Sequence, residues 1–518
     1  ESRDAGAISA DLPQRGRATM LEGPPRAAPS RPVRIVCLLR IVRSLRPVRP
    51  APMHTVLVTH YFPPIGGPGA RRMLGWVNGF VAEGHRVTVV TPAAHARDPY
   101  YQPAERYEGP ASVITPNILD PARLARGGGG DASPSGSQAA ATEKRGLAAR
   151  LRPWLLLPDQ RRLANGPLAC EARRVIASLD ERTVLLTSSP YNSVHLAGAT
   201  VKRSLRDRVT WIADFRDAWF HPVFFPHPNA TYRAYNRRLE RGVLRAADGL
   251  TVVSPKTLDR IRSRHDRAFE AKFWRTEGAA KWRWMPNGFD PTGVEPLLDG
   301  PCDDRPIAQR DPAEPIRVLF SGTLWQNHKL DALVAALAAV AERHNRRFRF
   351  ELAGRVIEPV PPSADPARLE IVTAGWKPYE ESLAATRAAD LLLVHTGPET
   401  QDIKIKLFDC AAVRRPVLVL GPTESATVRL ARRHGADPLV AEQSDQSTIE
   451  AALERFLASD ALAGHAFAGL PDEYNRIKQA SRLLDWASGL ARPDATRPGA
   501  PDPRLKRPRS RRPRRGST

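Results

Sequence analysis

A short apolar run, a glycine-rich loop and an amphipathic segment follow one another from residue 54, and they constrain the fold most strongly. The run His54–His60 is apolar and β-branched, as buried parallel strands are. The loop Tyr61–Gly69 contains three prolines and three glycines, and we predict that it is neither helix nor strand. A helix is predicted over about Ala70–Ala82, where apolar residues recur at steps of three and four, and Arg86–Thr91 is the next strand. This order indicates a βαβ unit with parallel strands.

The same alternation continues along most of the chain. A Pro-, Gly- and Asp-rich stretch at 287–315 indicates a linker, and 472–490 is predicted to be a closing amphipathic helix. We therefore predict an α/β protein of two Rossmann-like domains, at 53–286 and 316–471, with parallel sheets facing across a cleft. Further strands are predicted at Thr183–Ser188, Val209–Ala213, Leu250–Ser254, Ile316–Phe320, Arg347–Ala353, Leu369–Thr373, Leu391–His395 and Val417–Leu420.

The positive charge of the chain is concentrated at its two ends. The formal net charge is +23, and residues 1–52 hold ten Arg against four acids, whereas 492–518 hold ten Lys or Arg against two acids. Residues 1–52 and 491–518 are predicted to be disordered, the first of them as an extension ahead of Met53, and 126–136 is predicted to be a mobile loop. The moderately basic remainder suits an anionic partner, such as a nucleotide sugar, a lipid phosphate or a membrane surface.

Cysteine spacing and hydropathy restrict the class of protein. The four cysteines form no C-x-x-C pair, so neither a zinc site nor a disulfide framework is indicated, and a cytoplasmic location is expected. No apolar run reaches the ~18–20 residues that cross a bilayer.

Two segments of the first half carry candidate binding groups. Backbone N–H groups of Gly66 and Gly67 could approach a phosphate or a sugar, helped by the positive end of the next helix. Arg71 and Arg72 in its first turn oppose the helix dipole, which favours an anion contact. A tight turn without a ligand explains the same loop.

The second segment, at 213–219, follows a strand. Asp214 and Asp217 flank Arg216 there, where they could orient sugar hydroxyls or form a structural ion pair.

The second half offers a lysine and an aspartate at the start of a helix. Lys406 could reach a diphosphate, and Asp409 could accept hydrogen bonds from ribose hydroxyls. A solvated helix start accounts for both residues equally well. The segment 286–290, with Asn287-Gly288 inside it, indicates a tight turn.

Six motifs occur in one order: HYFPPIGGPGARR from His60, TSSPYNSVHLAG, ADFRDAW, PNGFD, FSGTLW, and KLFDCAAVRRPVLVL from Lys406. Together they resemble family 4 glycosyltransferases of the GT-B fold over about 53–490. The resemblance implies a retaining transfer from a UDP- or GDP-sugar without a cofactor or an obligatory metal. The acceptor, a glycan or a lipid-linked sugar, is then expected on the first domain and the nucleotide on the second.

The resemblance also assigns residues by position. It places Gly66 and Gly67 near the donor phosphates, and it implies that the remaining donor-binding residues are Gly322, Thr323, Lys329, Lys406, Leu407 and Asp409.

The sequence departs from the family pattern in several places. Thr323 stands where an Arg is frequent, and Lys329 lies one residue late. Asp409 replaces the second of two paired glutamates and Gln401 the first, for which Glu399 or Asp402 could substitute.

The chemistry of such a transfer needs stabilisation of the leaving diphosphate. Lysines and backbone N–H groups would supply it, and one good donor lowers the reaction barrier by roughly 3–4 kcal/mol. We expect Asp214 or His195 to polarise the acceptor hydroxyl, and Arg71, Arg216 and Asp217 to lie on the acceptor side.

Other functions remain open on the sequence alone. A sugar-nucleotide epimerase, a non-catalytic relative of these transferases and a nucleic-acid binder acting through the basic ends are the alternatives. Peripheral attachment to the inner face of a membrane is a separate hypothesis, for which a solvated helix face is the alternative reading of the residues Arg71, Arg72, Arg233, Arg237, Arg238 and Arg241.

Overall fold

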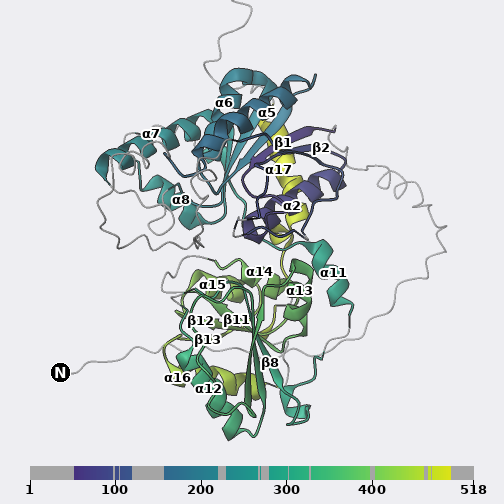
Figure 1. Cartoon of the computed structure of the whole chain (residues 1–518), viewed down its shortest axis with the longest axis vertical. Helices are drawn as coiled ribbons and strands as arrows, with labels where there is room; N and C mark the ends of the chain where they lie inside the picture. The colour runs from purple at the N-terminus through teal and green to yellow at the C-terminus, as the bar shows by residue number, and fades with distance from the viewer. Residues whose placement is uncertain are drawn as a thin grey trace, which may run out of the picture. The chain divides into compact units, whose positions relative to one another are not determined.

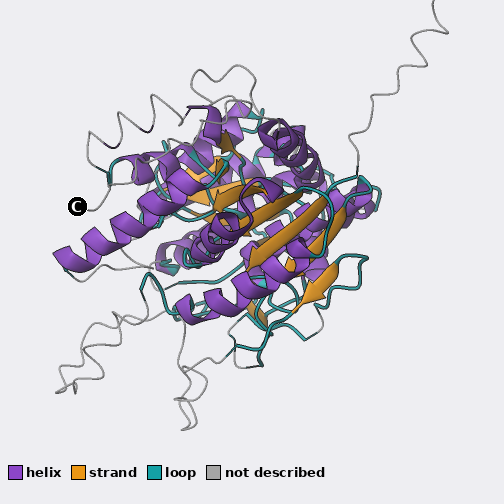
Figure 2. Ribbon diagram, turned by 90° about the horizontal axis from the view of Figure 1, so that it is seen from above, coloured by secondary structure: helices purple, strands orange, loops and turns teal. Residues whose placement is uncertain are grey.

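The computed structural model describes residues 52–491 except 97, 99, 104, 119–156, 220–228, 266–268, 270–272, 274–278, 301–302, 326–327, 397–402, 460–464 and 468. This part of the chain forms two parallel sheets. Figure 2 shows the strands lying between layers of helices. The predicted fold class, two Rossmann-like units with parallel sheets, is confirmed.

The first sheet has seven parallel strands in the order β3-β2-β1-β4-β5-β6-β7. Its strands are β1 His54–Thr59, β2 Arg86–Val90, β3 Ser112–Ile114, β4 Thr183–Ser188, β5 Val209–Phe215, β6 Gly249–Val252 and β7 Trp282–Trp284. The helices of this region are α2 Gly67–Ala82, α5 Asn165–Ala177, α6 Val194–Leu205, α7 Ala230–Ala246, α8 Pro255–Arg262 and α10 Ala279–Lys281.

Both faces of this sheet are buried. Successive residues of a strand point to opposite faces, so in β1 Val56 packs with α5 and α6 while Leu57 packs with α2. Strands that are covered on both sides are mostly apolar, which explains why they appear in the sequence as nearly continuous apolar runs such as Val56–Val58.

The second sheet has six parallel strands in the order β10-β9-β8-β11-β12-β13. They are β8 Ile316–Ser321, β9 Phe348–Ala353, β10 Leu369–Gly375, β11 Leu391–His395, β12 Val417–Leu420 and β13 Leu439–Ala441. The helices after residue 290 are α11 Pro291–Leu298, α12 Asp331–Arg343, α13 Tyr379–Ala388, α14 Lys406–Ala412, α15 Ala426–Arg433, α16 Gln446–Leu457 and α17 Arg476–Ala491. Helices α12 and α16 share the core of one face, and α13, α14 and α15 share the core of the other.

Each sheet has a point where the strand order reverses. The chain runs outward from β1 to β3 and then returns to place β4 beside β1. In the second sheet it runs from β8 to β10 and returns to place β11 beside β8. The connections diverge at these points and leave a crevice beyond the carboxyl ends of the strands, where open α/β sheets bind ligands.

The last helix packs on the first sheet's side of the molecule, against α2 (Figure 1). Trp76 Nε1 of α2 donates a hydrogen bond to Gln479 Oε1 of α17 over 3.2 Å. Gly79 allows this close approach, because a Cβ atom at that position would lie 2.5 Å from the Cβ of Ala480.

One sequence prediction is corrected by the fold. Residues 67–69 were expected to lie in an irregular loop, but they form the first turn of α2, where Pro68 is tolerated because it lacks only an N–H that has no helical partner. The predicted linker at 287–315 contains α11. No helix within the described ranges is long and apolar enough to cross a membrane.

Candidate functional site

A chain of polar contacts lies at the reversal point of the second sheet. Lys406 Nζ is 3.3 Å from Asp409 Oδ2 and donates to Ser382 Oγ over 3.4 Å. Ser382 Oγ is in turn 2.9 Å from the hydroxyl of Ser321, the last residue of β8. Tyr379 donates its hydroxyl proton to Asp409 Oδ1 over 3.1 Å. These five side chains form the candidate donor site.

The candidate donor site keeps its lysine within reach of a ligand. The side chain of Lys406 is 23% exposed, and it offers more hydrogen-bond donors than its two contacts use. Both oxygens of Asp409 already accept a bond, so a ribose hydroxyl would share this carboxylate with Lys406 and Tyr379. Burial and the nearby Asp409 carboxylate raise the pKa of Tyr379, which keeps its phenol protonated as a donor.

The turns that follow β8 and β9 each contain a glycine with a positive φ angle. Gly322 has φ 147° and Gly354, after β9, has φ 139°. The two turns touch, because a Cβ atom at Gly354 would lie 2.0 Å from the carbonyl oxygen of Gly322. Thr323 follows this turn and is partly exposed.

Lys329 is not part of the candidate donor site. It is half exposed and forms an ion pair with Glu358, which lies beyond β9. The structure pairs Lys406 with Asp409 and Lys329 with Glu358, so these three predicted donor-binding residues do not form one contact network in the described part of the chain. Glu399, Gln401 and Asp402 lie outside the described residues.

Two buried histidines lie at the same reversal point and were not predicted. The rings of His328 and His395, the last residue of β11, stack with centroids 4.6 Å apart, and Phe320 of β8 meets both edge-on. Burial lowers the pKa of His328 to about 4 and that of His395 to about 3. Both are neutral at physiological pH, and no motif spacing would have revealed them.

An aromatic group marks the reversal point of the first sheet. The rings of Tyr61 and Tyr191 stack with centroids 6.3 Å apart, and Tyr100 meets Tyr61 edge-on at 6.1 Å. His60 lies beside Tyr191 at 5.9 Å, and burial together with Arg161 lowers its pKa to about 3. We call Tyr61, Tyr100 and Tyr191 the tyrosine cluster. The sequence signal for it was the pair of motifs HYFPP and SSPYN, which follow β1 and β4.

Neighbouring residues occupy part of the glycine loop 66–69 beside the tyrosine cluster. The N–H of Gly66 donates to the carbonyl of Tyr100 over 2.7 Å and so does not face a ligand. Gly67 adopts φ 88° and begins α2 without a side-chain cap. The guanidinium of Arg216 covers Gly69, because a Cβ there would be 2.1 Å from Nη1.

The predicted acceptor-side residues lie at this carboxyl edge. Arg216 and Asp217 follow β5, with 3.5 Å between Arg216 Nη2 and Asp217 Oδ2, and their N–H groups donate to Ser189 Oγ. Arg71 forms an ion pair with Glu105, and its guanidinium lies 4.2 Å from the ring centroid of Tyr379. Arg71 therefore contacts an aromatic residue of the candidate donor site.

The predicted catalytic residue Asp214 has a structural environment instead. It is fully buried, and it accepts hydrogen bonds from Arg72, from Ser188 Oγ at 2.7 Å and from Thr251 Oγ1 at 2.7 Å. Arg72 is 1% exposed and also donates to the carbonyls of Met285 and Pro286. Both of its oxygens are hydrogen-bonded and out of solvent, which does not support the predicted contact with an acceptor hydroxyl.

Arg72 could have been assigned correctly from helix periodicity. It lies four residues before Trp76 and eight before Phe80, on the apolar face of α2. The same burial rules out the expectation that Arg72 faces an anionic surface.

His195 is likewise enclosed. Its side chain is fully buried, Nδ1 lies 2.8 Å from Thr187 Oγ1, and its ring packs on Phe215. Burial lowers its pKa to about 3, so the ring is neutral at physiological pH, and this enclosure does not support the predicted catalytic role. Among the residues that the structure describes, there is no group of three or more His, Cys, Asp or Glu side chains that could hold a metal ion.

Two Rossmann-like domains with parallel sheets define the GT-B fold. A trehalose 6-phosphate synthase from Burkholderia multivorans shares this fold, with a TM-score of 0.50 and 13% sequence identity over 85% of this chain and 99% of that one. HepE (Alr3699) from Anabaena, solved with UDP and glucose, gives a TM-score of 0.48 at 14% identity over 84% of this chain and 100% of that one. At these identities the likeness concerns the fold alone. No protein-family model and no curated protein matches the sequence.

Proposed function

We propose that this chain is a glycosyltransferase that takes a sugar from a nucleoside-diphosphate donor held by the second domain. The contact chain of Lys406, Asp409, Tyr379, Ser382 and Ser321 at the reversal point of the second sheet carries this proposal. The fold that the chain shares with a sugar-phosphate synthase supports it.

The role of Lys406 follows from charge. When the glycosidic bond to the donor breaks, negative charge develops on the diphosphate, and a preorganised ammonium in a partly buried site stabilises it. Asp409 holds the ammonium in place, and Tyr379 orients Asp409 through its hydroxyl. From the family resemblance we propose that the nucleotide is UDP or GDP, that the configuration of the sugar is retained and that no metal is required.

The tyrosine cluster is our candidate for the acceptor surface. Ligand sites combine aromatic walls with a few polar groups, and here Arg216 and Asp217 lie at the same carboxyl edge. With Asp214 and His195 buried, Asp217 is the predicted carboxylate that keeps access to solvent, at 36% exposure. We propose that it contacts the acceptor hydroxyl.

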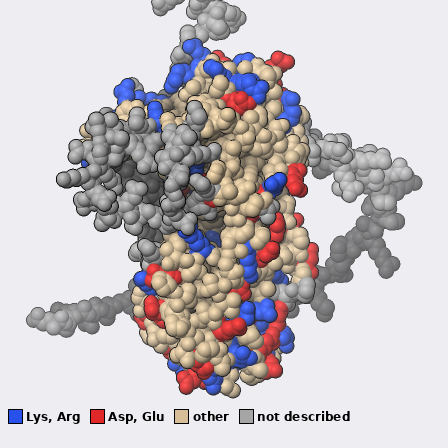
Figure 3. Space-filling view, in the orientation of Figure 1, with Lys and Arg blue, Asp and Glu red and all other residues tan. Residues whose placement is uncertain are grey.

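The acceptor class that we propose is a glycan or a lipid-linked sugar, as in assembly of a cell-envelope polysaccharide. A lipid-linked acceptor would place a cytoplasmic enzyme at the inner face of a membrane. On the face seen in Figure 3, Lys and Arg side chains gather near α5 and α6, while acidic and basic residues alternate over the second domain. A basic first domain would favour contact with anionic lipids.

A donor screen tests the proposal. UDP- and GDP-sugars are added to the full chain, and a rise in the unfolding temperature identifies the donor. Release of nucleoside diphosphate is then followed with candidate acceptors. Lys406→Met should abolish turnover, whereas Lys478→Met, which removes the same charge from the exposed face of α17, should not. Equal turnover in both variants would contradict the assignment of the candidate donor site.

A further inference from the structure

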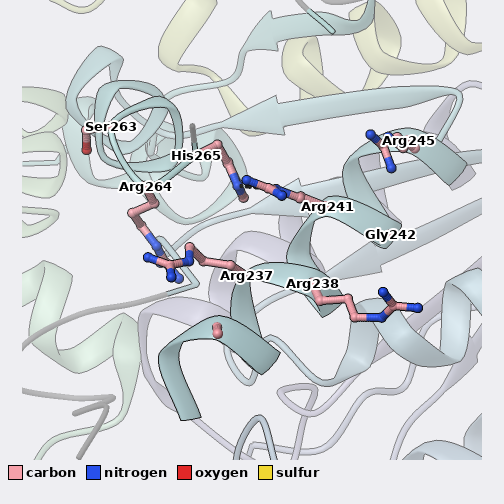
Figure 4. Close-up of a pocket in the computed structure, with 9 residues that line it drawn as sticks. Arg237, Arg238, Arg241, Gly242, Arg245, Ser263, Arg264 and His265 are labelled. Carbon is pink, nitrogen blue, oxygen red and sulfur yellow. Dashed lines mark hydrogen bonds between the residues drawn. The ribbon is translucent and has the colours of Figure 1, made fainter. Parts of the chain in front are cut away.

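A hollow of about 850 Å³ lies on the flank of the first domain, between α7 and the segment that follows α8 (Figure 4). Its lining includes Arg237, Arg238, Arg241 and Arg245 from α7 and Arg264 with His265 from the other side. Helix α7 leads from the carboxyl end of β5 back to the amino end of β6. At 1.5 Å per residue, Arg237 already lies about 10 Å along this helix, so the hollow lies away from the carboxyl edge and its tyrosine cluster.

The arginines of α7 repel one another in the absence of a ligand. Arg237, Arg241 and Arg245 are spaced four residues apart and therefore share one face of the helix. Like charges at this spacing destabilise a helix. Arg237 and Arg238 make no hydrogen bond or ion pair with any residue that the structure describes. The guanidinium donors of Arg237 and Arg238 are therefore available to a ligand.

A second segment adds another guanidinium. Figure 4 shows Arg237 and Arg264 approaching each other from opposite walls of the hollow. Burial lowers the pKa of Arg264, and the positive charge of Arg237 lowers it further, while Glu240 opposes both. An anion between Arg237 and Arg264 would remove this repulsion.

The walls hold these side chains in defined positions. Glu240 is fully buried, and its Oε2 lies 3.4 Å from Arg264 Nη2 and 3.2 Å from His265 Nε2. Arg241 Nε donates to His265 Nδ1 over 3.2 Å. The guanidiniums of Arg241 and Arg245 lie 4.9 Å from the ring centroid of Phe269. Glu240 thus acts as a positioning residue behind the basic wall.

We propose that this hollow binds a phosphate group, with Arg237 and Arg264 as its principal ligands and Arg241 as a further one. The planar fork of a guanidinium matches two phosphate oxygens at once, which an ammonium does not. The phosphate could belong to a soluble phosphorylated ligand or to a lipid headgroup. The proposal concerns a site separate from the candidate donor site and does not depend on sugar transfer.

Calorimetric titration of pyrophosphate tests the site. The full chain carrying Lys406→Met is used as the background, because this substitution weakens diphosphate binding at the candidate donor site. We expect pyrophosphate to bind this background, and Arg237→Ala to weaken binding at least tenfold. Arg173→Ala is the matched control, since it removes an exposed arginine from α5 of the same domain and should change affinity less than twofold.

Two further variants separate folding from recognition. Arg264→Ala should weaken binding like Arg237→Ala, and because it also leaves Glu240 without that ion pair, its unfolding curve is recorded beside it. Arg237→Lys keeps the charge and loses the fork, so its affinity should fall between those of the background and Arg237→Ala.

Co-sedimentation with vesicles identifies the source of the phosphate. Vesicles of phosphatidylglycerol, with phosphatidylcholine as the control, should bind in an Arg237-dependent way if the ligand is a lipid headgroup. Binding of pyrophosphate alone would indicate a soluble ligand. The proposal is overturned if pyrophosphate and vesicles both fail to bind the Lys406→Met background, or if Arg237→Ala behaves like Arg173→Ala. Neither outcome affects the assignment of Lys406.

Discussion

The buried pair of Arg72 and Asp214 makes the strongest prediction about stability. Substituting Asn for Asp214 keeps the shape of the side chain but replaces one acceptor oxygen with an NH2 group. Thr251 Oγ1 and Arg72 Nη2 donate to Oδ1, and Ser188 Oγ and Arg72 Nε donate to Oδ2. Whichever way the amide turns, two donors then face its NH2 group, and Arg72 keeps a buried charge without a counter-ion.

The expected loss is about 3–5 kcal/mol of unfolding free energy, the usual cost of removing one partner of a buried ion pair. Burial lowers the pKa of Arg72 and Asp214 opposes this shift, so Asp214→Asn removes the group that favours the charged guanidinium. The loss is measured by urea denaturation, from the change in midpoint and the slope m. Asp217→Asn, three residues along and partly exposed, is the control and should stay within about 0.5 kcal/mol of the wild type.

A double-variant cycle sharpens the test. Arg72→Met also removes the donors to the carbonyls of Met285 and Pro286, so it should cost at least as much as Asp214→Asn. The double variant Arg72→Met with Asp214→Asn should cost less than the sum of the two single losses, because no buried charge remains unpaired. A loss below about 1 kcal/mol for Asp214→Asn, combined with lost turnover, would refute the structural role and restore Asp214 as a catalytic residue.

Three further predictions concern pH, backbone and acceptor. The pKa of His195 is lowered to about 3, so the unfolded chain binds this proton first as pH falls below about 6.5, and folding stability falls with it. His195→Gln should flatten the curve of folding stability against pH by up to about 1.4 kcal/mol per pH unit between pH 6 and 4. Denaturation at several pH values measures this slope, and an unchanged slope would contradict the shift. Gly354→Ala should lower the unfolding free energy by about 1–3 kcal/mol, because its Cβ meets the carbonyl of Gly322 at 2.0 Å. Gly489→Ala, in open space on α17, should instead stabilise the fold by up to about 1 kcal/mol. Equal thermal unfolding temperatures of the two variants would refute the steric argument. Tyr191→Ala should raise KM for the acceptor roughly two- to tenfold while leaving the affinity for UDP unchanged, and a change confined to UDP binding would move the tyrosine cluster to the donor side.

The sheet architecture could be predicted because several long strands, among them β1, β4, β5 and β11, are buried along their whole length. Leu391–His395 is apolar at four of its five positions, and Thr183–Ser188 holds Val184, Leu185 and Leu186 in one unbroken run. Such unbroken apolar runs are typical of strands that lie between two helical layers. The three-residue strands β3, β7 and β13 were not predicted, since their pairing depends on a neighbour and not on their own composition.

The candidate site was only partly predictable. Lys406 and Asp409 lie three residues apart, so local sequence brings them together. Tyr379 and Ser382 come from a different helix and reach them only through the packing of α13 on α14, which no local pattern records. Lys329 was assigned to the donor phosphates by its position relative to a motif, yet it forms an ion pair with Glu358, twenty-nine residues later.

The central claim is that the second domain grips a nucleoside diphosphate through Lys406. Calorimetric titration of UDP and GDP into the full chain, its Lys406→Met variant and the Lys478→Met control tests it directly. We expect one nucleotide to bind the wild type and the control alike, and Lys406→Met to weaken that binding about ten- to hundredfold, as loss of a charge-assisted contact does. Equal affinity in all three proteins, or no binding of either nucleotide to the wild type, would contradict the claim.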